Sequence, residues 1–320
     1  KRNCLGVDGV DRKRLLFALL MCVAAGFFLG VLFQRFYDAG RLQTLLGLNI
    51  SREPVSEVTS DTLATSGLPA DLYGRLSLFI LAGQSNISGR GDLPPSPPSH
   101  SRVFTFGNDY RWKPAREPVD DPTDQVDSVS EDGRGDPAGF GPALSFALAV
   151  ASERPQWRIG LIPCAKGNST IEEWQRSLSD STLYGSCLKR IKAASLAGHV
   201  SGLLFFQGEA DAITPGQDQT RVLSVENYAA RFSDVVNALR QDLSLPNLPI
   251  VFAQIGNHKA PLAFANWERI REQQRAVRLP CGAMITTADL PLRDTVHFTT
   301  PAYEIIGQRF AAAYLALTPN

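Results

Sequence analysis

The sequence lacks an excess of charge of either sign. Its 32 Lys and Arg residues balance 32 Asp and Glu residues, which gives a formal net charge of zero over 320 residues. A broad nucleic-acid-binding surface needs clustered positive charge, so this balance argues against nucleic acid as a partner. Internal repeats are absent as well, and 44% of the residues are hydrophobic. This composition predicts an ordinary globular protein with one large domain or two small ones.

Residues that bind metals or nucleotides are scarce in the sequence. It has four His and five Cys, with no HxxxH pair and no CxxC pair, so a catalytic zinc is not expected. No P-loop and no GxGxxG motif opens a helix after a strand, so nothing in the sequence indicates a nucleotide. We therefore expect neither a metal nor another cofactor.

One apolar run is long enough to cross a membrane. Residues 15–33 (LLFALLMCVAAGFFLGVLF) contain no charge, and the charged positions of residues 1–14 before them are mostly basic. The positive-inside rule then places residues 1–14 in the cytosol as a tail. We predict a single-pass type II membrane protein with a signal anchor at 15–33 and its main domain lumenal or extracellular. A buried core helix is the alternative for this run.

The predicted topology leaves three cysteines on the oxidising side of the membrane. These are Cys164, Cys187 and Cys281. They allow one disulfide and one free thiol, and the sequence does not say which two residues pair.

A folded domain is predicted after a stem. Residues 34–70 are polar and lack sustained periodicity, which is typical of a stem, and residues 71–320 form the domain. Short apolar runs rich in β-forming residues alternate in it with helical patterns, so we expect an α/β fold with a parallel sheet covered on both faces. The expected strands are 76–82, 158–164, 202–207, 249–255 and 283–288, and the expected helices are 142–153, 183–199, 225–243, 266–277 and 301–317.

Two irregular insertions interrupt this alternation. Residues 92–102 are rich in Pro and Ser, which excludes regular structure. Residues 119–139 are acidic, which is typical of a solvated loop, with a calcium site or a substrate rim as the alternative.

The first predicted strand runs into a serine flanked by glycines. In LSLFILAGQSNISGRG (76–91) the apolar run stops at Gly83, and Ser85 follows two residues later. Such a turn presents one hydroxyl at the carboxyl end of a sheet, where α/β proteins place their sites. For this stretch alone, a strand-to-helix turn with a capping serine is the alternative.

A serine nucleophile needs a neighbouring base, and imidazole is the usual one. His297 is the strongest candidate because Asp294 precedes it by three residues, after the last predicted strand. An Asp in this position can accept the Nδ1 proton, which leaves Nε2 for the serine. For this pattern alone, a histidine hydrogen-bonded at a helix start is the alternative. His258 follows another strand and is a candidate neighbour of the site.

Two further polar segments follow predicted strands. In the segment 207–211 (QGEAD), Gln207 can donate an amide N–H to a developing oxyanion, and Glu209 can accept from neighbouring loops. Residues 164–170 (CAKGNST) have backbone N–H groups available for the same purpose. Because the carboxyl ends of parallel strands share one edge of a sheet, these motifs predict one common site.

The combination of motifs resembles a known enzyme family. Residues 83–87 lack the second Gly of GxSxG, which disfavours an α/β-hydrolase. The blocks GQSN (83–86), QGExD (207–211) and DxxH (294–297) instead resemble the motifs of the SGNH hydrolase superfamily. The similarity is greatest to its sialate O-acetylesterase-like branch, carbohydrate esterase family six with its plant-type carbohydrate esterases, and runs from about residue 76 to residue 315.

The resemblance implies a fold and a catalytic triad. The implied fold is a flavodoxin-like three-layer αβα sandwich with a five-stranded parallel sheet. By motif, Ser85 is the nucleophile, His297 is the general base and then the general acid, and Asp294 orients the imidazole.

The resemblance also implies an oxyanion hole and supporting residues. The hole would combine the backbone N–H of Ser85, an N–H of the Gly167-Asn168 turn and the Gln207 side chain. The implied supporting residues are Gln84, Asn86 and Glu209.

One departure from the family pattern concerns this oxyanion hole. The family favours a Gly pair followed by Thr, where this chain has Gly167, Asn168 and Ser169. If the donor there needs a positive φ, Asn tolerates it better than most other residues with a side chain.

The function implied by the resemblance is removal of acetyl groups from sugar hydroxyls without a metal. We expect a membrane-anchored carbohydrate O-acetylesterase, a serine-dependent carboxylic ester hydrolase, whose partner is an acetylated carbohydrate. Two alternatives are a polysaccharide O-acetyltransferase with the same acyl-enzyme and a non-catalytic glycan-binding protein on the same fold. The sequence predicts no particular glycan and no oligomeric state.

Overall fold

The computed structural model of the chain describes residues 66–97, 99–130, 138–214 and 219–319. The predicted cytosolic tail and membrane anchor, and the stem up to residue 65, lie outside these described residues. Within them, every helix is too short or too polar to span a lipid bilayer.

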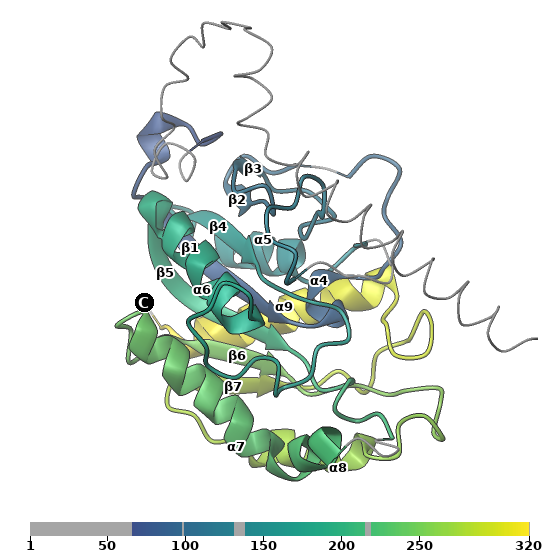
Figure 1. Cartoon of the computed structure of the whole chain (residues 1–320). Coiled ribbons are helices and arrows are strands. Elements are labelled where there is room, and N and C mark those ends of the chain that lie inside the picture. The colour runs from purple at the N-terminus through teal and green to yellow at the C-terminus, as the bar shows by residue number, and fades with distance from the viewer. Residues whose placement is uncertain (1–65, 98, 131–137, 215–218, 320) are drawn as a thin grey trace, which may run out of the picture. The chain divides into compact units, whose positions relative to one another are not determined.

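The described residues form a seven-stranded sheet in the order β3-β2-β4-β1-β5-β6-β7 (Figure 1). Neighbouring strands are parallel except β2 and β3, which pair antiparallel at one edge. The strands are β1 (Leu76–Gly83), β2 (Val103–Phe106), β3 (Trp112–Pro114), β4 (Arg158–Pro163), β5 (Gly198–Phe206), β6 (Ile250–Ala253) and β7 (Gly282–Ile285).

The prediction of five strands was too low. The five expected strands correspond to β1, β4, β5, β6 and β7, and β2 and β3 extend the sheet beyond β4. These two strands have only four and three residues and lie between the two irregular insertions, so each is too short to show a clear period. β1 lies at the centre of the sheet and all of its residues are buried, which explains its continuous apolar sequence.

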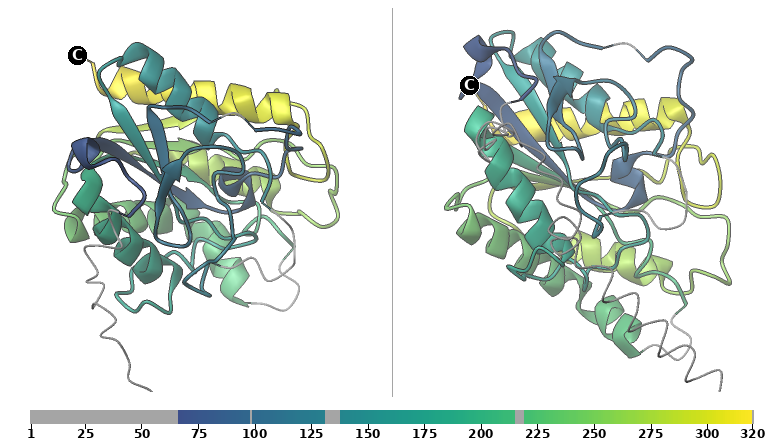
Figure 2. Two further views of the ribbon diagram at one scale, coloured as in Figure 1. Left: turned by 90° about the horizontal axis from the view of Figure 1, so that it is seen from above. Right: turned by 45° about the horizontal axis from the view of Figure 1, so that its top comes forward.

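Helices cover both faces of the sheet, as expected for alternating strands and helices (Figure 2). Helices α5 and α9 pack against each other on one face, and α6, α7 and α8 lie on the other. The helix bounds are α4 (Ser85–Ser88), α5 (Ala143–Glu153), α6 (Leu183–Ala194), α7 (Gln219–Asp242), α8 (Trp267–Ala276) and α9 (Thr300–Leu317), with short 3-10 turns at Ala70–Leu72 and Ser195–Ala197.

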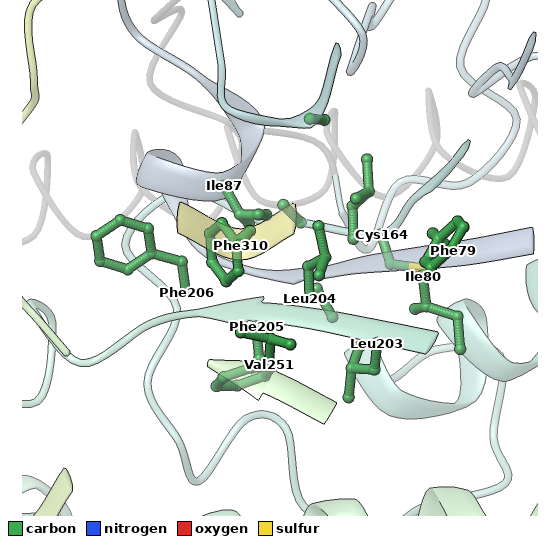
Figure 3. Packing of buried hydrophobic residues seen from close by; sticks show 14 of the residues in the cluster. Phe79, Ile80, Ile87, Cys164, Leu203, Leu204, Phe205, Phe206, Val251 and Phe310 are labelled. Carbon is green, nitrogen blue, oxygen red and sulfur yellow. The ribbon is translucent and has the colours of Figure 1, made fainter. Parts of the chain in front are cut away.

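Aromatic side chains fill the core between the sheet and α5 and α9. Phe79 of β1 is fully buried, and its ring lies 4.9 Å from both Phe146 of α5 and Tyr314 of α9, in edge-to-face contacts. Figure 3 shows Phe79 among the buried residues of the central strands, such as Leu204 and Val251.

A disulfide joins Cys164, which directly follows β4, to Cys187 in α6, with 5.3 Å between their Cα atoms. Cys281 is an exposed free thiol. The structure therefore settles which of the three cysteines pair. It also links the segment after β4 covalently to the helix layer.

The described part of the acidic insertion is held by a buried cation. Arg190 of α6 donates to Asp127 at 2.5 Å and to Asn108, and Asn108 donates to Asp120 at 2.9 Å. Among the described residues, His, Cys, Asp and Glu side chains form no cluster that could hold a metal ion. Asp127 and Asp120 thus anchor the loop to the domain, while residues 131–137 lie outside the described part.

We expect Phe79→Ala to lower the free energy of unfolding by about 3–5 kcal/mol, because it removes a ring held by two aromatic neighbours and leaves a cavity. Urea unfolding of the full chain measures this change. Leu178→Ala, at a side chain that is 61% exposed, is the control and should change stability by less than about 0.5 kcal/mol. Equal effects of the two substitutions would contradict this account of the core.

Candidate active site

The polar motifs expected at one site follow strands that lie side by side. β1 lies between β4 and β5, and these three parallel strands end at the same edge of the sheet. Residues 84–86 follow β1, residues 164–170 follow β4 and residues 207–211 follow β5. The long segment after β7 brings His297 to the same edge, where it contacts Ser85.

A tight turn after β1 presents Ser85. Gly83 has a φ of +129°, and a Cβ there would lie 2.1 Å from the Phe206 carbonyl oxygen, so only glycine fits between β1 and β5. The chain then enters the single-turn helix α4, whose first residue is Ser85.

Ser85, His297 and Asp294 form one hydrogen-bonded chain. Nε2 of His297 lies 2.8 Å from the Ser85 Oγ, and Nδ1 lies 2.8 Å from the Asp294 Oδ2. With the Nδ1 proton donated to the carboxylate, Nε2 is free to accept the serine proton. The structure thus brings together the three residues that the sequence singled out.

Asp294 also shapes the loop that carries His297. Its second oxygen, Oδ1, accepts the backbone N–H groups of Val296 at 3.0 Å and His297 at 2.9 Å. Partial burial alone would raise the pKa of Asp294, but the hydrogen bonds from His297 and Val296 outweigh burial and hold it below its usual value. The carboxyl is therefore ionised at neutral pH and able to orient the imidazole.

Asn86 joins three segments from the interior. Its side chain is fully buried and donates to Glu209 Oε1 at 2.6 Å and to the Val296 carbonyl at 3.2 Å. It also accepts a hydrogen bond from the Tyr303 hydroxyl of α9 at 2.6 Å. This one amide connects the turn that carries Ser85 to the segment after β5, to the loop that carries His297 and to α9.

Gln84 makes a second link between the turn that carries Ser85 and the segment after β5. Its side-chain oxygen lies 3.3 Å from the backbone N–H groups of both Gly208 and Ala210. Gln84 and Asn86 therefore both connect the turn that carries Ser85 to the segment after β5.

Gln207 is not placed as an oxyanion donor, which corrects the expectation from sequence. Its amide nitrogen donates to Asp211 Oδ2 at 2.5 Å and to the Ser169 carbonyl at 2.9 Å, and its side chain is fully buried. Both amide protons are therefore engaged. The sequence analysis missed this because one proton goes to Asp211, four residues further along the chain, and the other to the carbonyl of Ser169, 38 residues away.

The segment after β4 turns its backbone toward Ser85. Asn168 has a φ of +58°, the left-handed conformation that Asn tolerates better than most residues with a side chain. Within the described chain, the backbone N–H groups of Gly167 and Asn168 have no hydrogen-bond partner, whereas Lys166 N–H donates to the Gly83 carbonyl. Gly167 and Asn168 both line the pocket beside Ser85.

Hydrogen bonds of the Ser169, Trp174 and Asp211 side chains hold residues 164–171 in place. Ser169 donates its hydroxyl to the Gly83 carbonyl at 3.2 Å and accepts from the Trp174 indole at 3.1 Å. Asp211 accepts the Ile171 N–H at 3.0 Å. The roles of Trp174 and Asp211 were not assigned from sequence, because the Ile171 N–H lies 40 residues from Asp211 and the residue type of Trp174 does not indicate its bond to Ser169.

A pocket of about 140 Å³ lies over these residues. His258 does not line it; its ring contacts Phe264 edge to face and Trp267 at a tilt, with centroid distances of 5.4 and 4.7 Å. None of the described residues of the two insertions lines the pocket either. Its lining consists of Gln84, Ser85, Arg90, Gly167, Asn168, Glu209, Ala210, Ile213, Phe264, Val296 and His297.

Glu209 is an unusual carboxyl group at this pocket. It is 3% exposed, and burial raises its pKa to about 7. Its Oε1 accepts from Asn86, while Oε2 has no hydrogen-bond partner among the described residues. Glu209 therefore lines the pocket as well as supporting Asn86, and its burial favours the protonated form.

A family model and a curated relative match most of the chain. The model described as "Carbohydrate esterase, sialic acid-specific acetylesterase" matches residues 75–316. A protein of Arabidopsis thaliana described as a probable carbohydrate esterase is 32% identical over 260 residues, which cover 75% of this chain and 90% of that protein.

Solved structures resemble the same part of the chain. An Arabidopsis thaliana protein has a TM-score of 0.63 and 31% identity, over 76% of this chain and 98% of its own. A carbohydrate acetylesterase from Xanthomonas citri has a TM-score of 0.57 and 17% identity, over 75% of this chain and 56% of its own. NanS has a TM-score of 0.58 and 18% identity, over 76% of this chain and 98% of its own. At such identities the last two similarities show the fold alone.

The buried Glu209 makes stability depend on pH. A carboxyl whose pKa rises on folding holds its proton more tightly in the folded state, so stability is highest below the usual pKa of Glu and falls as the pH rises through about 7. Glu209→Gln keeps the oxygen that accepts from Asn86 but cannot ionise. Between pH 5 and pH 8 we expect the variant to lose less stability than the wild type, by on the order of 1–3 kcal/mol.

Urea unfolding at the two pH values measures this difference. Glu304→Gln, at an exposed position of α9, is the control and should show the same pH dependence as the wild type. Burial also raises the pKa of Glu117, to about 8. Because the wild type and both variants contain Glu117, it does not contribute to the difference between them. A variant as pH-dependent as the wild type would show that Glu209 is not the group responsible.

Proposed function

The chain belongs to the carbohydrate esterase family of sialic acid-specific acetylesterases, and we propose that it removes acetyl groups from sugar hydroxyls through an acyl-enzyme on Ser85. As a member of this family it is a carboxylic ester hydrolase. The hydrogen-bonded chain of Ser85, His297 and Asp294 is the observation that carries the proposed mechanism.

The first half of the reaction transfers the acetyl group to the enzyme. Ser85 Oγ attacks the acetyl carbonyl carbon while its proton passes to Nε2 of His297. Asp294 stabilises the imidazolium that forms. The tetrahedral intermediate then collapses, the bond between the carbonyl carbon and the sugar oxygen breaks, and His297 returns the proton to that oxygen. The sugar alcohol leaves and acetyl-Ser85 remains.

The second half regenerates the serine. A water molecule gives a proton to His297 as its oxygen attacks the acetyl carbonyl, and the bond to Ser85 Oγ breaks as the same proton returns to the serine. Acetate leaves. The two halves use the same groups in reverse order, as expected for a base that also serves as the acid.

Both tetrahedral intermediates carry a negative charge on the former carbonyl oxygen, and backbone groups near Ser85 support a binding site for this oxygen. We assign the oxyanion hole to the backbone N–H groups of Ser85, Gly167 and Asn168, without the Gln207 side chain. Fixed donors of this kind stabilise the transition state because they need no reorganisation as the charge develops. Each is worth about 3–4 kcal/mol in catalysis.

The proposed location of this reaction is the non-cytosolic side of a membrane, with residues 15–33 as the anchor. The disulfide between Cys164 and Cys187 supports this proposal, because disulfides persist in oxidising compartments.

Substitutions of the triad test the mechanism. We expect Ser85→Ala to lower kcat for acetate release from an acetylated sugar by at least about 10⁴-fold, because among the described residues Ser85 is the one nucleophile hydrogen-bonded to His297. Asp294→Asn should lower kcat by about 10³–10⁴-fold, because the amide favours the wrong imidazole tautomer. Ser181→Ala, at an exposed serine, is the control and should keep full activity. Substantial activity of Ser85→Ala would refute the acyl-enzyme proposal.

Substitutions of Asn168 test the oxyanion hole. Because the proposed donor is a backbone N–H at positive φ, Asn168→Gly should keep kcat within about threefold, since glycine adopts this conformation freely. Asn168→Val should lower kcat by about tenfold or more, because a β-branched residue in this conformation costs roughly 1–2 kcal/mol and shifts the turn. Steady-state kinetics with one acetyl ester compare the two. If Asn168→Gly were as damaging as Asn168→Val, the side chain rather than the backbone would be the donor, because both variants lack the amide.

A further inference from the structure

The pocket has an apolar wall that the reaction described above does not use. Ile213 and Phe264 line the pocket together with the polar groups around Ser85. Phe264 is partly exposed, so its ring is accessible to a molecule bound in the pocket. We propose that this wall, with Phe264 at its centre, binds the sugar ring of the leaving alcohol and is the part of the site that selects an acetylated pyranose. The proposal rests on the esterase function proposed above.

Hydrogen bonds join the segment that carries Ile213 to the segment that carries Phe264. Thr214, next to Ile213, donates its backbone N–H to the Ala263 carbonyl at 2.8 Å and its hydroxyl to the Leu262 carbonyl at 3.0 Å. The same hydroxyl accepts the Ala265 N–H at 3.2 Å. The residues on both sides of Phe264 are thus joined to the segment that supplies Ile213.

Aromatic contacts hold the Phe264 ring in place. Trp267 contacts it edge to face at 5.1 Å between ring centroids, and His258 contacts it at 5.4 Å. The Trp267 indole in turn donates to the Gly256 carbonyl at 2.8 Å. The ring is therefore fixed before substrate binds, so its ordering costs little binding energy.

The position of the wall identifies which part of the substrate it contacts. Lys259, in the loop that carries Phe264, donates its backbone N–H to the Thr295 carbonyl and its ammonium group to the Leu292 carbonyl. Thr295 lies two residues before His297, so the wall is attached to the loop of the base. His297 returns its proton to the leaving oxygen, and the alcohol therefore leaves on this side, whereas Asn168 borders the oxyanion side.

The chemistry of the wall suits one face of a sugar ring. A pyranose presents C–H groups on its faces and hydroxyls around its edge. The C–H groups can pack on an aromatic face, while the hydroxyls remain available to polar groups such as Asn168 and Glu209 at the same pocket. An acyclic alcohol has no such face and gains nothing from the wall.

Two substrates that differ only in the alcohol test the proposal on the full-length protein. One is a mono-O-acetylated methyl pyranoside and the other is ethyl acetate. We expect Phe264→Ala to lower kcat/KM for the pyranoside about five- to twentyfold, mainly by raising KM, because the ring is bound equally in the ground and transition states. The change for ethyl acetate should be less than about twofold, because the triad is untouched.

Leu262→Ala is the matched control. Leu262 lies on the same loop and is 93% exposed, but it does not line the pocket, so both substrates should react as in the wild type. Phe264→Tyr, which keeps an aromatic face, should retain the preference for the pyranoside.

The outcomes separate this proposal from the proposed function. Equal losses on both substrates, or no loss on either, would overturn a role of Phe264 in selecting the sugar, even with the esterase proposal intact. If Ser85→Ala kept its activity, the acyl-enzyme proposal would fail, while the ratio between the substrates would still decide the role of Phe264. A wild-type protein that cleaves ethyl acetate but no acetylated pyranoside would overturn both the sugar substrate and the selecting wall.

Discussion

The geometry of the site depends on the buried side-chain amide of Asn86. Its three hydrogen bonds reach Glu209, Val296 and Tyr303, which belong to segments 123 to 217 residues away in the chain. An amide buried without partners would be strongly unfavourable, so the fold with all three bonds made is much more stable than one in which any segment has moved. Since Ser85 precedes Asn86 and His297 follows Val296, this constraint also sets the distance between the Ser85 hydroxyl and the His297 imidazole.

A second set of constraints positions the opposite side of the site. The disulfide attaches the segment after β4 to α6, and Asp211 receives both the Ile171 N–H and the Gln207 amide. The Gln207 amide thereby supports the turn at residues 167–169, which we propose as part of the oxyanion hole, and both of its protons are engaged. The left-handed Asn168 carries some backbone strain, which the surrounding hydrogen bonds hold in place.

Local patterns predicted much of the fold. The apolar runs of β1 and β4 to β7 are recognisable because a strand buried on both faces has a continuous apolar sequence. The strands β2 and β3 were missed, since a stretch of three or four residues carries too little periodicity and is stabilised by pairing with its neighbours. In the site, DxxH and the glycine-flanked Ser85 were recognisable because their geometry is set within a few residues.

The sequence by itself predicted the α/β class and singled out Ser85, Asp294 and His297 as a candidate triad, while the positive φ of Asn168 became known from the structure. The class and the candidate triad follow from residue types at short spacing. Only the tertiary structure decided that Cys164 pairs with Cys187, that the Gln207 amide donates to the Ser169 carbonyl, and that Phe264 lines the same pocket as His297. The physical reason is that each of these depends on which partner a side chain meets. A side chain with several possible partners takes the one that the packing of remote segments brings within reach.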